Sequence, residues 1–203
     1  MGIKNIIYDL GGVLLEIHYQ KSEVAFTELG LTNYNDHFKQ DYSSTLFEQL
    51  ETGSINEHTF CDKIRAIFHT DISDNKIKSA WNAMLGNFIP ENLDILKRSA
   101  QNHNIYLFSN TNKIHHDEFM EIYQQQFGKK DFDNHFIKAY YSHSCGWRKP
   151  NPQAYINLLE AENLIASETL FIDDTLKNIE GAKEAGLKTF HLTHPTLLSS
   201  LFL

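Results

Sequence analysis

The sequence predicts a doubly wound α/β protein, with a five-stranded parallel sheet and a helical bundle inserted after the first strand. The apolar run over residues 3–9 is continuous, as expected for a parallel strand that is covered on both faces. Residues 16–88 show only helical spacing of their apolar side chains, whereas strand and helix patterns alternate regularly from residue 90 onward. We therefore expect an α/β core over residues 1–15 and 89–203 and a helical cap subdomain over residues 16–88.

The expected strands share a short apolar run bounded by polar residues or turn signals. They span residues 3–9, 104–108, 136–141, 169–172 and 188–192. Helices are defined by apolar periodicity and by end signals, such as Asn56 and Ser73 as N-caps and Pro90 in a first turn. They are expected near residues 20–29, 45–50, 56–68, 73–84, 90–102, 150–159 and 179–185, with a polar helix after 112, a loop over 124–134 and a short terminal helix from 195.

Composition narrows the class of protein. The chain has 203 residues, of which 41% are hydrophobic, enough for one core with an inserted subdomain. Its formal net charge of −8 disfavours nucleic acid as a partner, because such a surface repels a phosphate backbone. Cys61 and Cys145 lie far apart without metal-binding spacing, so we expect free thiols in a reducing cytosol. No leader pattern or 18-residue apolar window occurs, which predicts a cytoplasmic protein with no membrane partner.

Polar side chains that can do chemistry follow several of the expected strands. Asp9 ends the first strand, Ser109 the second, and the pair Asp173 and Asp174 the fourth, while Lys149 lies in the loop after the third. Ligands of doubly wound sheets bind outside the carboxyl ends of the strands. We therefore expect these groups to converge on one edge of the sheet.

This set of groups suits a phosphoryl group and a hard cation. Asp9 and Asp174 offer the carboxylate oxygens that Mg²⁺ prefers. Lys149 can balance phosphoryl charge, and Ser109 with the amides around Asn110 can donate hydrogen bonds to phosphoryl oxygens. Asp9 would then attack phosphorus as a nucleophile. Spacing alone also allows a plainer interpretation, in which Asp9 is a turn residue and the later aspartates cap a helix.

Four ordered motifs carry a resemblance to a known family. They read Asp9-Leu10-Gly11-Gly12-Val13, Ser109-Asn110-Thr111-Asn112, Arg148-Lys149-Pro150-Asn151-Pro152 and Phe171-Ile172-Asp173-Asp174. In this order, and with a helical insertion after the first, they resemble the haloacid dehalogenase superfamily over essentially the whole chain. The second motif and the series Asp173, Asp174, Asn178, Gly181 and Ala182 resemble small bacterial sugar-phosphate phosphatases that act on substrates such as glucose 1-phosphate.

The resemblance implies a magnesium site and a phosphoryl site. Asp9 would be both the nucleophile and a Mg²⁺ ligand, with the backbone carbonyl of Gly11 and the carboxylate of Asp174 as the other protein ligands. Ser109 and Lys149 would be catalytic residues that bind the phosphoryl group, and Asn110 would also contact substrate. Asp173 would orient Lys149 or a metal-bound water, with Asn178 beside it in support.

Gly11 departs from the family pattern. Most phosphatases of the superfamily have an aspartate there, which protonates the leaving group, and such a general acid contributes about 10²–10⁴-fold to the rate. The backbone carbonyl survives the change to glycine, but the acid is lost. We expect slow turnover, or a substitute acid from Glu16, His18 or the cap.

Three functions follow from these residues. The favoured one is a Mg²⁺-dependent phosphatase of small phosphorylated metabolites, with sugar phosphates as the first candidates. The second is a phosphate-binding regulatory protein that lost turnover together with the acid at Gly11. The third is dehalogenation of 2-haloacids without a metal, which Lys149 and the pair Asp173 and Asp174 disfavour.

Overall fold

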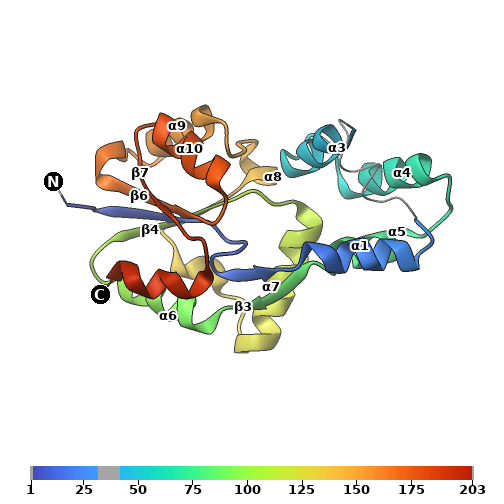
Figure 1. Ribbon diagram of the computed structural model, residues 1–203, viewed down its shortest axis with the longest axis horizontal. Coiled ribbons are helices and arrows are strands. Elements are labelled where there is room, and N and C mark those ends of the chain that lie inside the picture. The colour runs from blue at the N-terminus through green and yellow to red at the C-terminus, as the bar shows by residue number, and fades with distance from the viewer. Residues whose placement is uncertain (1, 32–41, 203) are drawn as a thin grey trace.

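The computed structural model describes residues 2–31 and 42–202, and its centre is a five-stranded parallel sheet (Figure 1). In sheet order the strands are β5 (Lys138–Tyr141), β4 (Asn104–Ser109), β1 (Asn5–Tyr8), β6 (Thr169–Asp173) and β7 (Lys188–His191). Every neighbouring pair runs parallel. The predicted α/β class and its five core strands are confirmed.

Alternate strand residues face opposite layers of helices, which explains why the strands are apolar throughout. On one face lie α6 (Pro90–Ser99), α7 (Lys113–Phe127) and the terminal 3₁₀ helix η3 (Pro195–Phe202); on the other lie α9 (Pro152–Ala161) and α10 (Leu176–Glu184). Ile6 and Tyr8 of β1 pack into the first layer, whereas Ile7 packs into the second. The sheet is therefore buried on both sides.

Several element ends differ from the prediction. Helix α7 continues to Phe127, into the segment expected to be a loop, and ends where Gly128 adopts a left-handed conformation (φ 74°). Short helices η1 (Phe132–His135), α8 (Ser142–Cys145) and η2 (Ala166–Glu168) complete the core. Among the described residues, no helix is both long and apolar enough to span a bilayer. The cytoplasmic location stays a prediction.

Helices of the insertion form a second cluster at one end of the molecule (Figure 1). They are α1 (Tyr19–Glu28), α3 (Tyr42–Glu51), α4 (Glu57–Phe68) and α5 (Asp74–Asn82). Their apolar faces bury side chains such as Phe26, Phe60, Ile64 and Ile77 against one another. The expected caps lie at the starts of α4 and α5, but only Asn56 accepts a hydrogen bond, from the Thr59 amide at 2.9 Å. Residues 32–41 of the insertion lie outside the described part of the chain.

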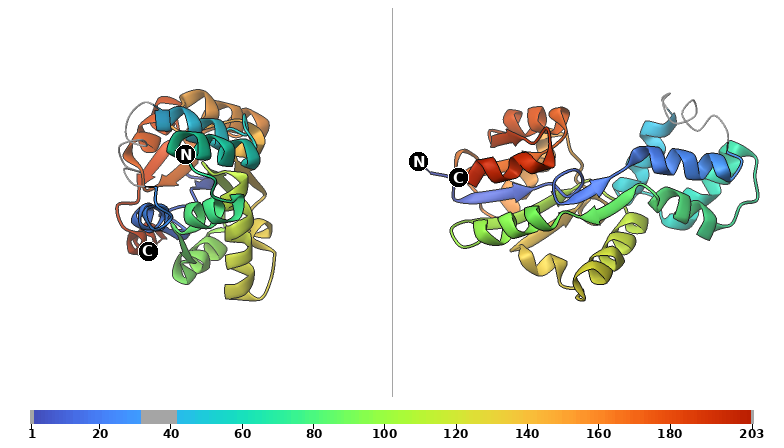
Figure 2. Two further views of the ribbon diagram at one scale, coloured as in Figure 1. Left: turned by 90° about the vertical axis from the view of Figure 1, so that its right-hand side faces the viewer. Right: turned by 60° about the horizontal axis from the view of Figure 1, so that its bottom comes forward.

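The insertion is joined to the core by a short antiparallel ribbon, which the sequence analysis missed. Strands β2 (Leu15–Ile17) and β3 (Leu85–Phe88) pair side by side between the two parts, as Figure 2 shows. The expectation of helices alone over residues 16–88 is therefore wrong. Unlike most of the core strands, these short segments have no continuous apolar run, and Gly86 is a poor strand former.

Candidate active site

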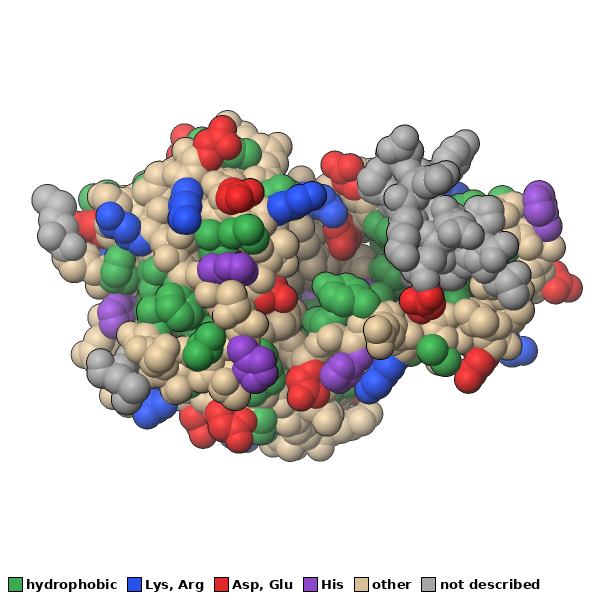
Figure 3. Space-filling view, in the orientation of Figure 1, with side chains coloured by type: hydrophobic (Ala, Val, Ile, Leu, Met, Phe, Trp, Pro, Cys, Tyr) green, Lys and Arg blue, Asp and Glu red, His purple; other side chains and the backbone are tan. Residues whose placement is uncertain are grey.

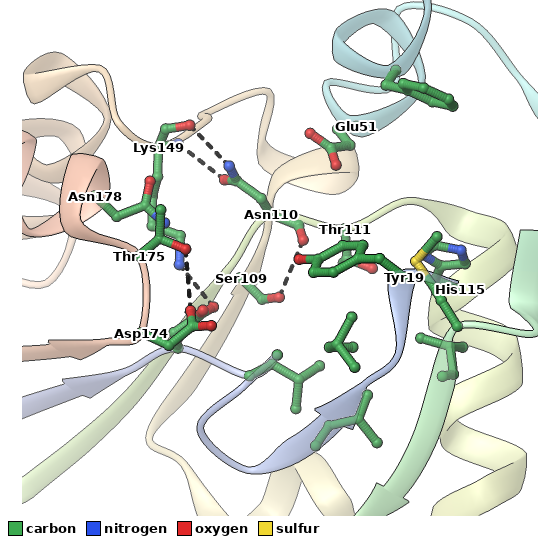
Figure 4. Close-up of a pocket in the computed structure, with 18 of the residues that line it drawn as sticks. Tyr19, Glu51, Ser109, Asn110, Thr111, His115, Lys149, Asp174, Thr175 and Asn178 are labelled. Atoms are coloured by element: carbon green, nitrogen blue, oxygen red, sulfur yellow. Dashed lines mark hydrogen bonds and ion pairs between the residues drawn. The ribbon is translucent and has the colours of Figure 1, made fainter. Parts of the chain in front are cut away.

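A cavity of about 750 Å³ lies between the carboxyl ends of the core strands and the inserted helices. Figure 3 shows the surface hollowed between the two parts of the molecule. The core side contributes Asp9, Ser109, Lys149 and Asp174, and the insertion contributes Tyr19, Glu51 and Trp81. The expected groups therefore converge on one edge of the sheet (Figure 4).

Three carboxylates meet where strands β1 and β6 end. Asp9 follows the last residue of β1, Asp173 ends β6, and Asp174 comes next. One oxygen from each lies within 4.8 Å of the others, and Asp9 and Asp173 are buried. Parallel strands deliver their ends to the same edge, which is why residues far apart in sequence share this space.

Lys149 is the cation of the cluster. Its ammonium lies 2.7 Å from Asp9 Oδ1 and 2.8 Å from Asp173 Oδ2, and only 1% of the side chain is exposed. Burial disfavours the charged ammonium, but the carboxylates of Asp173 and Asp9 outweigh it and raise the pKa of Lys149. The lysine is therefore held charged at the point where a phosphoryl group would meet Asp9.

The cluster still carries surplus negative charge. Burial raises the pKa of Asp9 to about 8, opposed by Lys149 and reinforced by Asp173 and Asp174. Burial and then Asp173 likewise raise the pKa of Asp174. A bound divalent cation would relieve this repulsion, and carboxylate oxygens are the ligands that Mg²⁺ prefers. The donor set therefore fits magnesium.

Asp173 is bound by protein donors on both of its oxygens. Oδ1 accepts from the Thr175 amide at 2.8 Å and from Asn178 Nδ2 at 3.1 Å. Oδ2 accepts from Lys149 at 2.8 Å and from the same Asn178 nitrogen at 3.0 Å. This saturation favours Asp9 and Asp174 as the metal-facing pair and supports the expected role of Asp173, with Asn178, in orienting Lys149.

Gly12 lets Asp174 approach the turn after β1. Its φ of 71° is left-handed, and a Cβ at this position would lie only 2.6 Å from Cγ of Asp174. The preceding Gly11 is different, because a Cβ there would meet only the flexible Ile17 side chain, with 3.1 Å to Cγ1. Glycine is therefore required at position 12 by space and by conformation, but not at position 11.

Asn110 and Ser109 have different surroundings. The Asn110 amide donates to the Lys149 carbonyl at 2.8 Å, and its Oδ1 accepts from the Lys149 amide at 2.9 Å. This side chain therefore holds the lysine loop, which leaves only the backbone of Asn110 for the expected substrate contact. Among the described residues, the Ser109 hydroxyl has only a long 3.5 Å contact, with the Asn110 carbonyl, so it can turn toward a ligand.

Helix α10 supports the lysine loop from behind. A Cβ on Gly181 would lie 2.9 Å from the carbonyl carbon of Pro150 and closer still to its oxygen. The absence of a side chain lets the helix backbone contact the residue after Lys149. Gly181 therefore helps to position Lys149 by letting α10 approach the loop.

Two expected substitutes for the missing acid lie outside the cavity. On β2, Leu15 and Ile17 line the cavity, so the intervening Glu16 points away from it. His18 Nε2 lies 3.6 Å from Glu16 Oε2, and both side chains crowd the position of Gly86 on β3. The expectation that Glu16 or His18 replaces the acid is therefore wrong, because neither side chain lines the cavity.

An aromatic stack forms the cavity wall where the insertion meets α7. The Trp81 ring lies 4.6 Å from that of Phe47 and 4.8 Å from that of His115, stacked on both. His115 Nε2 lies 3.2 Å from the Trp81 carbonyl oxygen, and burial lowers the pKa of the imidazole to about 4. His115 is therefore a neutral part of the wall at physiological pH.

Tyr19 and Glu51 are cavity residues that the sequence analysis did not single out. Glu51 Oε2 accepts from Arg148 Nε at 2.7 Å, which ties α3 to the residue before Lys149. Tyr19 is the first residue of α1 and follows β2 almost directly. Both face the core only because of how the insertion is placed on the sheet, and no spacing in the sequence reports that placement.

The chain is similar to known proteins over most of its length. Residues 6–192 match the family described as haloacid dehalogenase-like hydrolases. A D-ribitol-5-phosphate phosphatase from Bacteroides thetaiotaomicron is 29% identical over 93% of this chain and 91% of its own. A sesquiterpene phosphatase from Aspergillus oryzae is 25% identical over 94% of this chain and 90% of its own.

Solved structures show the same likeness. A HAD family enzyme from B. thetaiotaomicron is 32% identical, with a TM-score of 0.86 over 94% of each chain. The structure of that enzyme with magnesium and inorganic phosphate gives a TM-score of 0.82 over the same shares. The family match over residues 6–192 spans the four motifs, the sheet and the insertion. This chain belongs to the haloacid dehalogenase-like hydrolase family.

Proposed function

We propose that this hydrolase is a Mg²⁺-dependent phosphomonoesterase of small phosphorylated metabolites, acting through an aspartyl phosphate on Asp9. The observation that carries the proposal is the Lys149 ammonium, buried between Asp9 and Asp173 with Asp174 beside them. A nucleophile, a cation for the phosphoryl group and carboxylates for a metal thus share one edge of the sheet. The phosphatase names of two relatives and the structure of a HAD family enzyme with magnesium and inorganic phosphate agree with this chemistry.

The residues divide the reaction between them. Asp9 attacks phosphorus in line with the departing oxygen, and its carboxylate takes the phosphoryl group. Lys149 neutralises charge on the phosphoryl oxygens, and the Ser109 hydroxyl donates a hydrogen bond to one of them. Water then attacks the acyl phosphate and restores Asp9. Asp173 keeps Lys149 in place throughout, through its 2.8 Å ion pair.

Asp9 and Asp174, with the Gly11 carbonyl, would hold the magnesium ion. When bound, the ion supplies positive charge that screens the repulsion between the anionic nucleophile and the anionic substrate. The raised pKa of Asp9 in the metal-free site agrees with such a requirement.

Sugar or polyol phosphates are the substrates we propose. The cavity of about 750 Å³ has room for a small metabolite, and its polar wall includes Glu51 and Arg148, which can hydrogen-bond to hydroxyl groups. The D-ribitol-5-phosphate phosphatase supports the same class. In this proposal residues 16–88 are the cap that chooses the substrate, and residues 1–15 and 89–203 are the catalytic core.

The test is release of inorganic phosphate from a panel of phosphorylated metabolites, with Mg²⁺ and with chelator. We expect activity that needs Mg²⁺ and is lost in Asp9→Asn, which retains the shape of the side chain but not its nucleophilic oxygen. Phosphate binding without turnover on every substrate would support the regulatory alternative. Chelator-insensitive release of halide from 2-haloacids would support the dehalogenase alternative.

A further inference from the structure

The leaving group of a phosphomonoester needs a proton, and this chain lacks the aspartate that the family places two residues after the nucleophile. Gly11 stands there, and Glu16 and His18 lie outside the cavity. An alkoxide leaves far more slowly than an alcohol, so an active enzyme needs another donor. Any such donor must reach the cavity from a different element.

Tyr19 reaches into the cavity from the start of α1. Its side chain lines the cavity together with Asp9, Ser109 and Lys149, yet 71% of it is exposed, because it stands in open space rather than against a wall. Figure 4 shows the ring extending from the insertion, with its hydroxyl end directed toward Ser109 and Asn110. Among residues 2–31 and 42–202, no hydrogen-bond partner holds that hydroxyl.

We infer that Tyr19 is the proton donor to the leaving-group oxygen, in place of the aspartate absent at position 11. The inference rests on the proposed phosphatase function. The aspartate's role is thus taken by a side chain of the insertion, whose hydroxyl end is directed toward Ser109 and Asn110 (Figure 4).

Protons are conserved over the two half-reactions. As Asp9 forms its bond to phosphorus, the bond to the leaving oxygen breaks and its electron pair stays on that oxygen. The oxygen takes the phenol proton and departs as an alcohol. In the second half-reaction water attacks the phosphorus of the aspartyl phosphate and gives a proton to the phenolate, which restores Tyr19.

The surroundings of the phenol keep it protonated. Partial desolvation within the cavity, and then the carboxylates of Asp174 and Asp9, raise the pKa of Tyr19 to about 12. The hydroxyl is therefore protonated at neutral pH and ready to donate. An alkoxide is a stronger base than a phenolate, so the transfer is downhill, although a phenol is a weaker acid than the carboxyl group it replaces.

Other proton-bearing side chains of the cavity are less suited. His115 is neutral, with Nε2 on the Trp81 carbonyl. The Glu51 carboxylate is engaged by Arg148 at 2.7 Å. Glu23 and Lys177 also line the cavity, from α1 and α10, so the experiment includes a variant of each.

The experiment compares two substrates in Tyr19→Phe. One is an alkyl phosphate that the enzyme hydrolyses, such as a polyol phosphate, and the other is p-nitrophenyl phosphate, whose leaving group needs no proton. We expect kcat on the alkyl ester to fall by about 10²-fold or more, while kcat on the aryl ester is retained. Because the side chain is 71% exposed, the variant should keep the wild-type melting temperature.

A second variant tests whether an aspartate at position 11 can replace Tyr19. Gly11→Asp in the Tyr19→Phe background should recover most of the lost kcat on the alkyl ester, since a side chain at position 11 displaces only the flexible Ile17. Glu23→Gln and Lys177→Met are the matched controls, and each should change both substrates by the same factor.

Each outcome decides the assignment. An equal loss on both esters, no loss on either, or selective loss in Glu23→Gln or Lys177→Met would overturn the role of Tyr19. Failure of the phosphatase function looks different, because wild-type protein would then release no phosphate with Mg²⁺, or Asp9→Asn would remain active. If the wild type is active and Asp9→Asn is not, an unselective Tyr19→Phe refutes the Tyr19 inference alone.

Discussion

At the scale of single residues, two adjacent glycines have unrelated reasons for being glycine. Gly12 combines a left-handed backbone with close approach to Asp174, so it admits no side chain. Gly11 has space beside it, and its lack of a side chain removes a chemical group rather than preventing a clash. In the proposed function, Gly11 bears on protonation of the leaving group and Gly12 bears on magnesium binding.

We therefore predict that Gly12→Ala weakens magnesium binding. The new methyl group would displace the Asp174 carboxylate, so the Mg²⁺ concentration needed for half-maximal turnover should rise by about tenfold or more, as for other disruptions around metal ligands. Gly30→Ala is the matched control, because Gly30 has a φ of 86° but no atom of the described residues within 4 Å of its missing Cβ. An equal change in both variants would mean that backbone strain alone is responsible.

The sequence predicted the site residues at the strand ends, but it did not predict the site residues on the insertion. Asp9, Ser109 and Asp173 are placed by the direction of parallel strands, which apolar runs reveal. Tyr19 and Glu51 depend on how one group of helices is set upon a sheet. That placement is determined by side-chain packing across many residues, such as Ile114 of α7 within the insertion's own apolar cluster.

At the scale of elements, the lysine loop is held between two neighbours. Asn110 at the end of β4 binds both backbone groups of Lys149, and α10 presses its Gly181 against Pro150. The position of the ammonium is therefore a property of the strand end and of the helix behind it.

Gly181→Ala should consequently destabilise the protein and lower kcat together. Alanine in a helix interior usually gains about 1 kcal/mol over glycine, but here its Cβ would overlap the Pro150 backbone, which cannot yield like a flexible side chain. We expect the free energy of unfolding in urea to fall by about 1–3 kcal/mol.

Glu180→Ala, at the exposed neighbouring position of α10, should leave both quantities close to wild type. A Gly181→Ala protein that is more stable than wild type, as helix propensity alone requires, would refute this account of the loop.

Most elements could be predicted, and the failures have a common cause. Most of the core strands lie in apolar runs bounded by turn signals, and the inserted helices are long enough to show a period. Strands β2 and β3 have three and four residues, and the end of α7 lacks a breaker before Gly128. Where a short element has neither a continuous apolar run nor a clear period, tertiary pairing decides its conformation.

At the scale of the whole molecule, the buried site opposes stability until a cation binds. The pKa of Asp9 is about 8 in the folded protein, against about 4 for an unfolded chain. Between these values the folded metal-free protein binds more protons than the unfolded one. Its free energy of unfolding therefore falls as the pH rises through this range.

Magnesium should therefore stabilise the protein more at high pH than at low pH. At about pH 5 the metal must displace a proton from Asp9, whereas at about pH 8 about half of the carboxylate is already ionised, so the rise in melting temperature on adding Mg²⁺ should be larger at the higher pH. Thermal unfolding with Mg²⁺ or chelator at both pH values measures this. Asp9→Asn should lose the difference, and the exposed Asp94→Asn should keep it. A rise of equal size at both pH values would contradict the assignment.

The β2–β3 ribbon has a consequence for how such an enzyme can be rebuilt. Leu15 pairs with Phe88, so the insertion leaves and rejoins the core at adjacent backbone positions, about 5 Å apart in an antiparallel pair. A helical segment from another protein could replace the insertion without distorting the core sheet, provided that its two ends lie equally close together. The ribbon is thus a natural splice point, at which a new substrate-facing module could be grafted onto an unchanged phosphoryl site.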